Sequence, residues 1–184
     1  MDTIDLISKK INIKGIIGLS DKVKKNNISD YSYQGKFCNN RKINFIELDS
    51  YKINKDSDLA KLRKLDIDVL IVVGWQRLIP KFLINQCRKI VIGIHGSPFG
   101  ITKGRGRSPQ NWTLLLGFKS FFISIFKIDS GIDSGDIINT GKFELSDHDD
   151  IRTSYYKVSM LTSNMIIEYI NNNSINSKSL TKQN

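Results

Sequence analysis

The sequence predicts an α/β fold, with a mostly parallel β-sheet and helices on both of its faces. Two stretches, Val69 to Val73 and Ile90 to Ile94, are uninterrupted apolar runs rich in β-branched residues. Such runs are typical of strands that are covered on both faces, as in parallel sheets. Helical patterns alternate with these strands along the chain, and this alternation is the signature of an α/β sheet.

The N-terminal part of the chain predicts two helices and two strands. Asp2 is placed to cap a first helix, whose apolar residues share one face. Strands are expected at Ile13 to Leu19 and Ile43 to Leu48, and a second helix at Ser57 to Leu65. Ser20 to Lys42 is polar and poorly periodic, so we expect mostly loop there.

The C-terminal part predicts three more helices and two more strands. A short helix begins near Pro80, where proline suits the first helical turn. Further elements are expected as a helix at Pro109 to Leu116, strands at Phe121 to Ile128 and Ile137 to Phe143, and a long helix at Asp150 to Asn171.

Length and composition fit one globular domain of ordinary core size. The chain has 184 residues, of which 40% are hydrophobic and 25% charged. We expect this domain over residues 1–171, and a polar, Ser- and Asn-rich tail over residues 172–184 that is disordered. No apolar run approaches the roughly 20 residues of a membrane-spanning helix, and no signal peptide is recognisable, so a cytoplasmic protein is expected.

The formal net charge of +10 raises the question of a nucleic-acid partner. The lysines are scattered and no recognition motif accompanies them, which disfavours nucleic acid and leaves attraction of anionic substrates as a milder interpretation. The two cysteines, Cys38 and Cys87, and the two histidines lack metal-ligand spacing, so no metal site is predicted.

The segment from Gly93 to Pro109 carries the densest chemistry and starts at the end of an apolar strand. Ligand sites of open α/β sheets gather at the carboxyl ends of strands. His95 can move protons near neutral pH, although a lone histidine is more often structural. Arg105 and Arg107 stand among glycines, which suits either phosphate binding or a mobile solvent loop. Neither a P-loop nor a dinucleotide fingerprint occurs.

A second cluster, Asp129 to Asp136, holds three aspartates between two strands. Gly131 and Gly135 permit backbone conformations that can aim a carboxylate inward. An ordinary polar hairpin explains the same residues equally well, with Asp129 or Asp136 serving only the turn.

In chain order, three motifs resemble the 10-formyltetrahydrofolate-dependent formyltransferase family: Gly74 to Pro80, His95 to Ser97, and Asp129 to Ile137. This family includes methionyl-tRNA formyltransferase, glycinamide ribonucleotide transformylase and the sugar N-formyltransferases. Its pattern is Asn-x-His followed by Asp-x-x-Asp-x-Gly. The resemblance covers about Ile13 to Ile170 and implies a Rossmann-like formyltransferase core with 10-formyltetrahydrofolate as formyl donor.

The resemblance also implies roles for individual residues. His95 and Asp133 match the catalytic pair, in which the imidazole stabilises the tetrahedral oxyanion or shuttles a proton and the carboxylate orients it. The two loops that enclose the folate pterin match Gln76, Arg77, Leu78, Ile79, Asp129, Ser130, Gly131 and Ile132. The run from Gly104 to Trp112 is most similar to the sugar N-formyltransferases. This places four side chains near the acceptor or its phosphates, namely Ser97, Lys103, Arg105 and Arg107.

Two departures from the family pattern are visible. Gly93 stands where the family has asparagine, so one donor to the formyl oxygen is missing, and Asn111 or a backbone amide is the candidate substitute. The family's first strand has no counterpart in the chain, so we expect a core that is short at its N-terminus, either because the recorded start is truncated or because the sheet has lost that strand.

The resemblance favours transfer of a formyl group to the amine of a nucleotide-linked amino deoxysugar, with folate and the sugar as partners and a homodimer as a possible assembly. Alternatives are a methionyl-tRNA or glycinamide ribonucleotide formyltransferase, or a degenerate folate- or nucleotide-binding protein without turnover.

Overall fold

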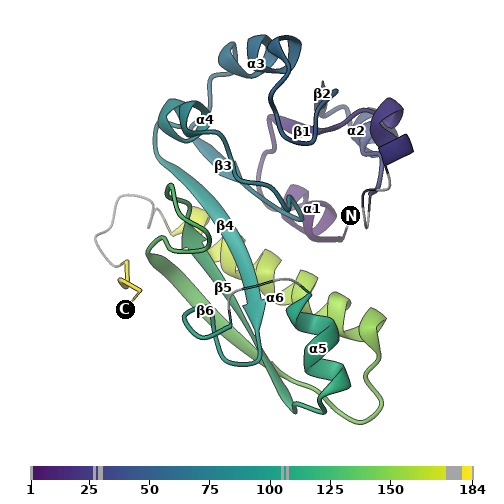
Figure 1. Ribbon diagram of the computed structural model, residues 1–184, viewed down its shortest axis with the longest axis vertical. Coiled ribbons are helices and arrows are strands. Elements are labelled where there is room, and N and C mark those ends of the chain that lie inside the picture. The colour runs from purple at the N-terminus through teal and green to yellow at the C-terminus, as the bar shows by residue number, and fades with distance from the viewer. Residues whose placement is uncertain are drawn as a thin grey trace. The chain divides into compact units, whose positions relative to one another are not determined.

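The structure is a computed structural model that describes residues 2–26, 28, 31–104, 106, 108–172 and 180–183. Their contacts divide the chain into two compact units, which we describe separately (Figure 1). The first unit comprises residues 1–11, 68–74 and 87–184, and the second comprises residues 12–67 and 75–86. The expectation of one domain over residues 1–171 stays a prediction.

The first unit contains a four-stranded sheet in the order β3-β4-β5-β6. Its strands are β3 (Val69–Ile71), β4 (Ile90–Ser97), β5 (Ser120–Lys127) and β6 (Ile137–Glu144). β3 and β4 are parallel, whereas β5 is antiparallel to both β4 and β6. The short connection from Lys127 to Ile137 allows only an antiparallel pair, because a parallel pair needs a longer crossover.

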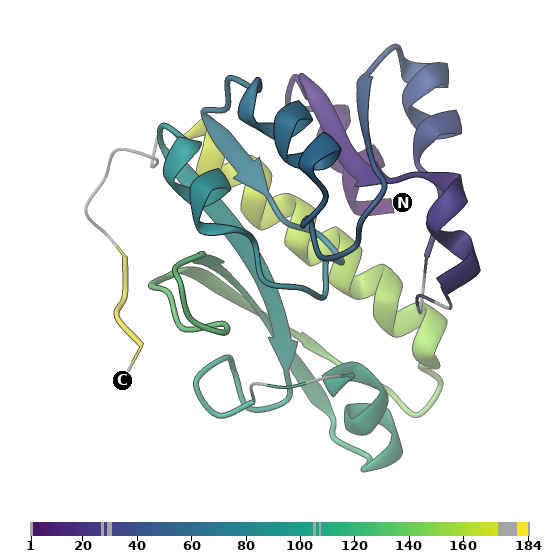
Figure 2. The ribbon, with the colours of Figure 1, turned by 45° about the horizontal axis from the view of Figure 1, so that its top comes forward.

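Helices α1 (Asp2–Ser8), α5 (Pro109–Leu115) and α6 (Ile151–Asn171) complete the first unit. α6 packs on β5 and β6 and also contacts α1 and α5 (Figure 2). On β5, Phe121, Ile123 and Ile125 alternate along one face and are almost completely buried, as is Ile166 of α6. This apolar layer fixes the strands that carry the residues discussed below.

The second unit contains a parallel pair, β1 (Gly15–Leu19) and β2 (Asn44–Leu48). Its helices are η1 (Asp21–Asn26), α2 (Gly35–Arg41), α3 (Asp56–Arg63) and α4 (Lys81–Gln86). The α/β class is therefore confirmed. Among the described strands, however, two pairings are parallel and two antiparallel, so the sheets are mixed where a mostly parallel sheet was expected.

The expectation of mostly loop between Ser20 and Lys42 is wrong in part, because η1 and α2 lie there. α2 buries one side chain, Cys38, which is 1% exposed, and it ends at Lys42 in the left-handed conformation. One buried residue in a seven-residue helix is too little to produce a helical hydrophobic period.

Part of the tail that was expected to be disordered has a defined place. Thr181 forms an antiparallel bridge with Ile137 at the start of β6. The backbone of Thr181 thus has partners on the edge of the sheet, and the expectation of a disordered tail over residues 172–184 stays a prediction. Residues 173–179 and 184 lie outside the described part of the chain.

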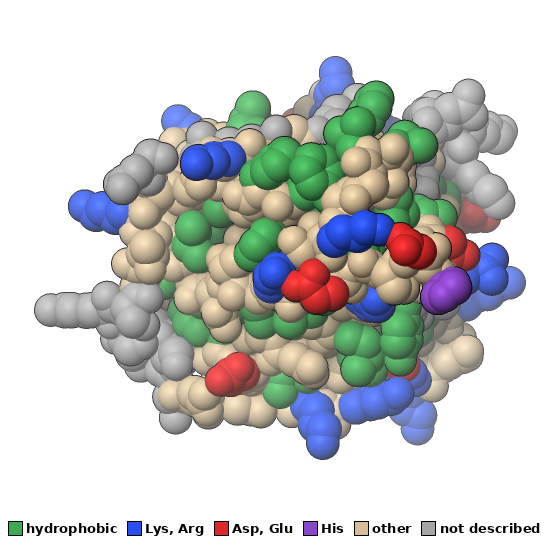
Figure 3. All heavy atoms as spheres, turned by 90° about the horizontal axis from the view of Figure 1, so that it is seen from below, with side chains coloured by type: hydrophobic (Ala, Val, Ile, Leu, Met, Phe, Trp, Pro, Cys, Tyr) green, Lys and Arg blue, Asp and Glu red, His purple; other side chains and the backbone are tan. Residues whose placement is uncertain are grey.

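The surface of the first unit exposes apolar side chains on α5. Trp112, Leu115 and Leu116 are 59%, 76% and 65% exposed. Figure 3 shows hydrophobic side chains at the surface on one face of the molecule, with lysine and arginine side chains spread among them and not gathered in one basic patch. Within the described residues, no helix has the length and apolar character needed to cross a bilayer.

The start of α6 is fixed by charged hydrogen bonds. Asp150 and Thr153 form a reciprocal capping box at the first turn. The carboxylate of Asp149 accepts hydrogen bonds from Lys157 Nζ and from the backbone and side chain of Ser146. These bonds, that from Lys157 above all, hold the pKa of Asp149 well below its ordinary value.

We expect Asp149→Asn to lower the melting temperature at neutral pH, and the difference from wild type to shrink as the pH falls below 3.8, the ordinary pKa of the aspartate side chain. A group whose pKa is lowered by folding stabilises the protein above its ordinary pKa, and this stabilisation disappears as the pH falls through the folded-state value. Thermal unfolding monitored by circular dichroism between neutral and acid pH measures the difference. Glu144→Gln, which removes an exposed ion pair with Lys142, is the control and should change little. A difference that stays constant with pH would contradict this account.

Candidate active site

His95 lies inside β4, near its C-terminal end. The strand was expected to end at Ile94 but continues to Ser97, because β5 pairs with it from Ile92 to Ser97, and His95 is opposite Ser124. The side chain of His95 is only 9% exposed. The rigid ladder therefore fixes the position of the imidazole.

Both ring nitrogens of His95 have partners in the first unit. Nε2 lies 2.8 Å from the carbonyl oxygen of Gly104, and Nδ1 lies 3.4 Å from Oδ2 of Asp133. Because a carbonyl oxygen can only accept, Nε2 carries the proton in the first contact. His95 then needs a second proton, on Nδ1, to donate to Asp133. The 3.4 Å separation is longer than a strong hydrogen bond, which is common for catalytic contacts without substrate.

The loop between β5 and β6 aims Asp133 at the imidazole. Asp133 has a φ of 49°, in the left-handed region that residues other than glycine seldom adopt. The carboxylate of Asp129 holds the loop from inside, since Oδ1 accepts from Gly131 N at 2.9 Å and from Ser134 Oγ at 2.8 Å. Gly135 is required by space, because a Cβ there would collide with the carbonyl of Lys127. The strained conformation of Asp133 is therefore imposed by its neighbours.

Asp129 was expected to line the folate site, and its Oδ1 instead serves the turn. The other expected members of this loop, Ser130, Gly131 and Ile132, are exposed, with Ile132 at 69%. A contact of these residues with folate stays a prediction.

Ser97, which was expected near the acceptor, is not accessible at the surface of the structure. It is completely buried, its Oγ accepts a hydrogen bond from Phe99 N at 3.0 Å, and a Cβ at Gly104 would collide with that same oxygen. Its hydroxyl supports the turn that brings the Gly104 carbonyl to His95. A contact of Ser97 with an acceptor would require this turn to open, and it stays a prediction.

The remaining residues expected near the acceptor are only partly placed. Lys103 is exposed in the turn before Gly104, whereas Arg105 and Arg107 lie outside the described residues. Asn111 is exposed in the first turn of α5, a helix preceded by Ser108 in the left-handed conformation. The structure does not bring Asn111 into a defined contact with His95, so its role as a donor stays a prediction.

The other expected pterin loop, Gln76 to Ile79, belongs to the second unit. Within that unit, Gln76 N donates to Tyr51 Oη at 3.2 Å, and the guanidinium of Arg77 lies 4.8 Å from the centre of the Tyr51 ring. Trp75 packs edge-on against the same ring at 5.1 Å. Sequence reasoning missed Tyr51 as the support of this loop, because a lone tyrosine 25 residues away gives no local signal.

Gly93 occupies the family's asparagine position for a steric reason. It is the cross-strand partner of Phe126, and a Cβ at Gly93 would lie 2.5 Å from Phe126 Cζ and 2.9 Å from Ile128 Cγ1. The aromatic ring of Phe126 therefore fills the space that an asparagine side chain needs. Packing an aromatic residue against a cross-strand neighbour stabilises the sheet, so the two positions depend on each other.

We expect Gly93→Asn to destabilise the protein by about 1–3 kcal/mol, the usual cost of overpacking a well-filled site. The double substitution Gly93→Asn with Phe126→Ala should be less destabilised than the sum of the two single substitutions, because the smaller residue makes room. Urea unfolding of the four proteins measures this coupling. Additive effects would show that Phe126 does not exclude a side chain at position 93.

The fold of the chain is that of the formyltransferases. The structure superposes on phosphoribosylglycinamide formyltransferase from Streptococcus pneumoniae TIGR4 with a TM-score of 0.70, at 14% identity, over 91% of this chain and 92% of that one. The enzyme of the same name from Bacillus halodurans gives a TM-score of 0.70 at 16% identity, over 96% and 91% of the two chains.

The sequence comparison then identifies the family. The model of the "Formyl transferase" family matches residues 6–170, which is most of the chain, so the chain belongs to this family. The resemblance inferred from the His95 and Asp133 motifs is confirmed at this level.

The curated relatives include methionyl-tRNA formyltransferases. That of Pelagibacter ubique is 36% identical over 124 residues, which cover 67% of this chain and 39% of the relative. That of Thermodesulfovibrio yellowstonii is 30% identical over 119 residues, which cover 65% of this chain and 38% of the relative. The chain thus spans well under half of the length of these relatives. They do not support the narrower resemblance to the sugar N-formyltransferases.

Proposed function

We propose that this chain carries the catalytic core of an enzyme that transfers the formyl group of 10-formyltetrahydrofolate to a primary amine, and that this amine is the amino group of methionyl-tRNA. The observation that carries the proposal is the contact of His95 with Asp133, at the carboxyl end of β4, in a chain of the formyltransferase family.

The proposed reaction is an acyl transfer. The neutral amine attacks the formyl carbon, a new C–N bond forms, and the negative charge moves to the formyl oxygen. The bond from the formyl carbon to the folate nitrogen then breaks, and the proton lost by the amine is taken up by that nitrogen. A positioned donor at the oxyanion contributes on the order of 3 kcal/mol to the stability of such a transition state.

His95 suits the task of oxyanion donor and proton carrier. Its Nε2–H is held by the Gly104 carbonyl, so donation to the formyl oxygen requires an exchange of Gly104 for the substrate. Gly104 thus keeps the donor oriented until the formyl group arrives. Asp133, at Nδ1, orients the ring and balances the charge of the doubly protonated imidazole.

One observation supports methionyl-tRNA as the acceptor. The relatives named for this substrate are up to 36% identical to this chain, so the proposal takes a nucleic acid as partner although the scattered lysines alone disfavour one. The nucleotide-linked amino sugar is the second candidate, because the run from Gly104 to Trp112 resembles that of the sugar enzymes.

A direct assay separates these acceptors. The chain is supplied with 10-formyltetrahydrofolate and, in parallel, with methionyl-tRNA, glycinamide ribonucleotide or nucleotide-linked amino sugars. Tetrahydrofolate release and the acceptor's gain of one formyl group are recorded. Product with methionyl-tRNA alone is the expected result. Product only with an amino sugar would replace the proposed acceptor, and folate binding without product from any acceptor would favour a binding protein.

Substitution of the pair tests its chemistry. We expect His95→Ala to lower kcat/KM by on the order of 100-fold to 10,000-fold, the usual contribution of a positioned proton-transfer group. Asp133→Asn should also lower it severely, because the amide cannot balance an imidazolium charge. Asp136→Asn is the matched control, because Asp136 contributes its backbone oxygen to the ladder, where it accepts a hydrogen bond from Lys127 N, and the substitution leaves this oxygen unchanged. Wild-type kinetics in His95→Ala or Asp133→Asn, with folding intact by circular dichroism, would remove that residue from the mechanism.

The proposal also assigns a role to Asn111. If its amide replaces the family's missing donor, Asn111→Ala should lower kcat by about a hundredfold to a thousandfold with little change in KM, because an oxyanion donor acts mainly in the transition state. The control is Leu115→Ala, because the Leu115 side chain is exposed. Gln110→Ala is unsuitable, because Gln110 Nε2 donates a hydrogen bond to Ser154 Oγ in the core. Unchanged kcat in Asn111→Ala would leave oxyanion stabilisation to His95 and backbone amides.

A further inference from the structure

Residues 180–183, which we call the strap, form one antiparallel bridge to the edge of the sheet at the start of β6. Thr181 N donates to Ile137 O at 2.9 Å, and Ile137 N donates to Thr181 O at 2.8 Å. This reciprocal pair is the hydrogen-bonded type of antiparallel pairing. Figure 1 shows the strap beside the connection between β5 and β6.

The strap also holds the loop that carries Asp133. Gln183 Nε2 donates to the carbonyl oxygen of Gly135 at 2.6 Å. Gly135 is two residues from Asp133 and packs on the backbone of Lys127. The loop is therefore fixed from inside by Asp129 and from the outer edge of the sheet by Gln183.

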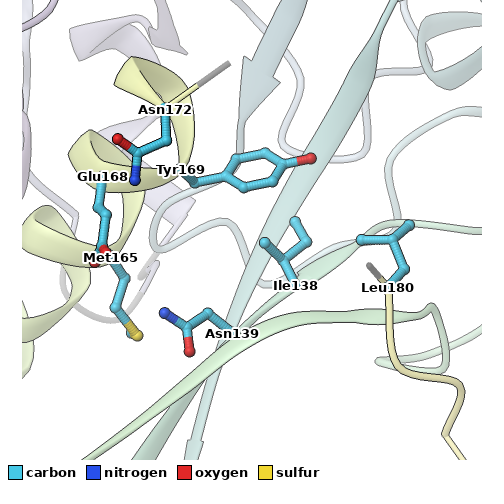
Figure 4. A pocket seen from close by; sticks show the side chains of 7 residues that line it. All are labelled: Ile138, Asn139, Met165, Glu168, Tyr169, Asn172 and Leu180. Atoms are coloured by element: carbon cyan, nitrogen blue, oxygen red, sulfur yellow. The ribbon is translucent and has the colours of Figure 1, made fainter. Parts of the chain in front are cut away.

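Leu180 of the strap lines a cavity of about 130 Å³. Figure 4 shows Tyr169 reaching from α6 toward the side where Ile138 and Leu180 lie. The other lining residues are Asn139, Met165, Glu168 and Asn172. The hydrogen bonds that hold the strap are the reciprocal pair between Thr181 and Ile137 and the bond from Gln183 to Gly135.

We propose that the strap is a positioning element for Asp133: its bonds to Ile137 and Gly135 keep the loop in the conformation that aims the carboxylate at His95. The role rests on the proposed formyl transfer. A residue with φ of 49° needs neighbours that over-determine its backbone, and the strap supplies one such restraint through the hydrogen bond from Gln183 Nε2 to the Gly135 carbonyl. Gln183 and Thr181 act through Asp133 and do not touch the reacting atoms.

Two pairs of matched variants of the full chain test the proposal. Thr181→Pro removes the N–H that donates to Ile137, whereas Thr181→Val keeps it. Gln183→Glu replaces the donor amide by a carboxylate that cannot donate, whereas Lys182→Gln alters an exposed neighbour within the strap. Gln183→Lys restores a donor at position 183 and serves as the rescue variant.

The first measurement does not depend on activity. We expect amide hydrogen exchange at Ile137 to become at least about tenfold faster in Thr181→Pro and Gln183→Glu, because each variant removes a hydrogen bond that holds the strap, and a detached strap takes the Thr181 carbonyl away from the Ile137 amide. The amide of Gly131, bonded to Asp129, should keep its wild-type rate and serves as the internal reference. If Ile137 exchanges at the wild-type rate in both variants, the proposal that the strap binds the edge of β6 is wrong, whatever the activity.

The second measurement is kinetic. We expect kcat to fall by about tenfold in Thr181→Pro and Gln183→Glu while KM for 10-formyltetrahydrofolate changes by less than about twofold, because misaimed catalytic groups slow the chemical step. Thr181→Val, Lys182→Gln and Gln183→Lys should retain the wild-type kcat. Faster exchange at Ile137 with unchanged kcat overturns the positioning role. A wild-type chain that yields no formylated product counts against the proposed function, while the exchange result still decides whether the strap exists.

Discussion

The contact between His95 and Asp133 depends on a strained turn. Asp133 can face the imidazole only because its backbone adopts a φ of 49°, and this conformation persists because Asp129 bonds the loop from inside and Gly135 fits against Lys127. The β5–β6 hairpin thus holds the Asp133 carboxylate in place, because the loop is fixed at both ends by paired strands of the sheet. Every chemical step proposed above needs this carboxylate at Nδ1 of His95.

The same sheet explains why the site departs from the family pattern. β4 pairs with β5 from Ile92 to Ser97, so each residue of this stretch has an assigned neighbour on β5. Phe126 covers Gly93 and removes the space for an asparagine side chain. On the other side of His95, the Gly104 turn brings a carbonyl oxygen to Nε2, and this carbonyl orients the ring. At position 93, β4 therefore packs against Phe126 and offers no side-chain donor to the formyl oxygen. Any replacement donor must come from outside β4.

The fold class, most of the helices and strands, and the pairing of His95 with Asp133 could be predicted from the sequence. Features that depend on tertiary contacts could not. Strong apolar periods marked β4, β5 and α6, whereas α2 was missed because only Cys38 is buried in it. The His95 and Asp133 motifs lie far apart in sequence, and only the family resemblance joined them. The burial of Ser97, the role of the Gly104 carbonyl and the pairing of Thr181 with Ile137 depend on backbone placement, which leaves no pattern in the side chains.

The measurement that tests the central claim most directly is a double-mutant cycle on formyl transfer with His95→Ala, Asp133→Asn and the combined variant. If Asp133 acts only through His95, removing the carboxylate from a chain that already lacks the imidazole costs nothing further, and the combined variant has the kcat/KM of His95→Ala alone. Losses that multiply, so that the combined variant is slower by the product of the single effects, would show two independent groups and contradict the account of a single catalytic pair.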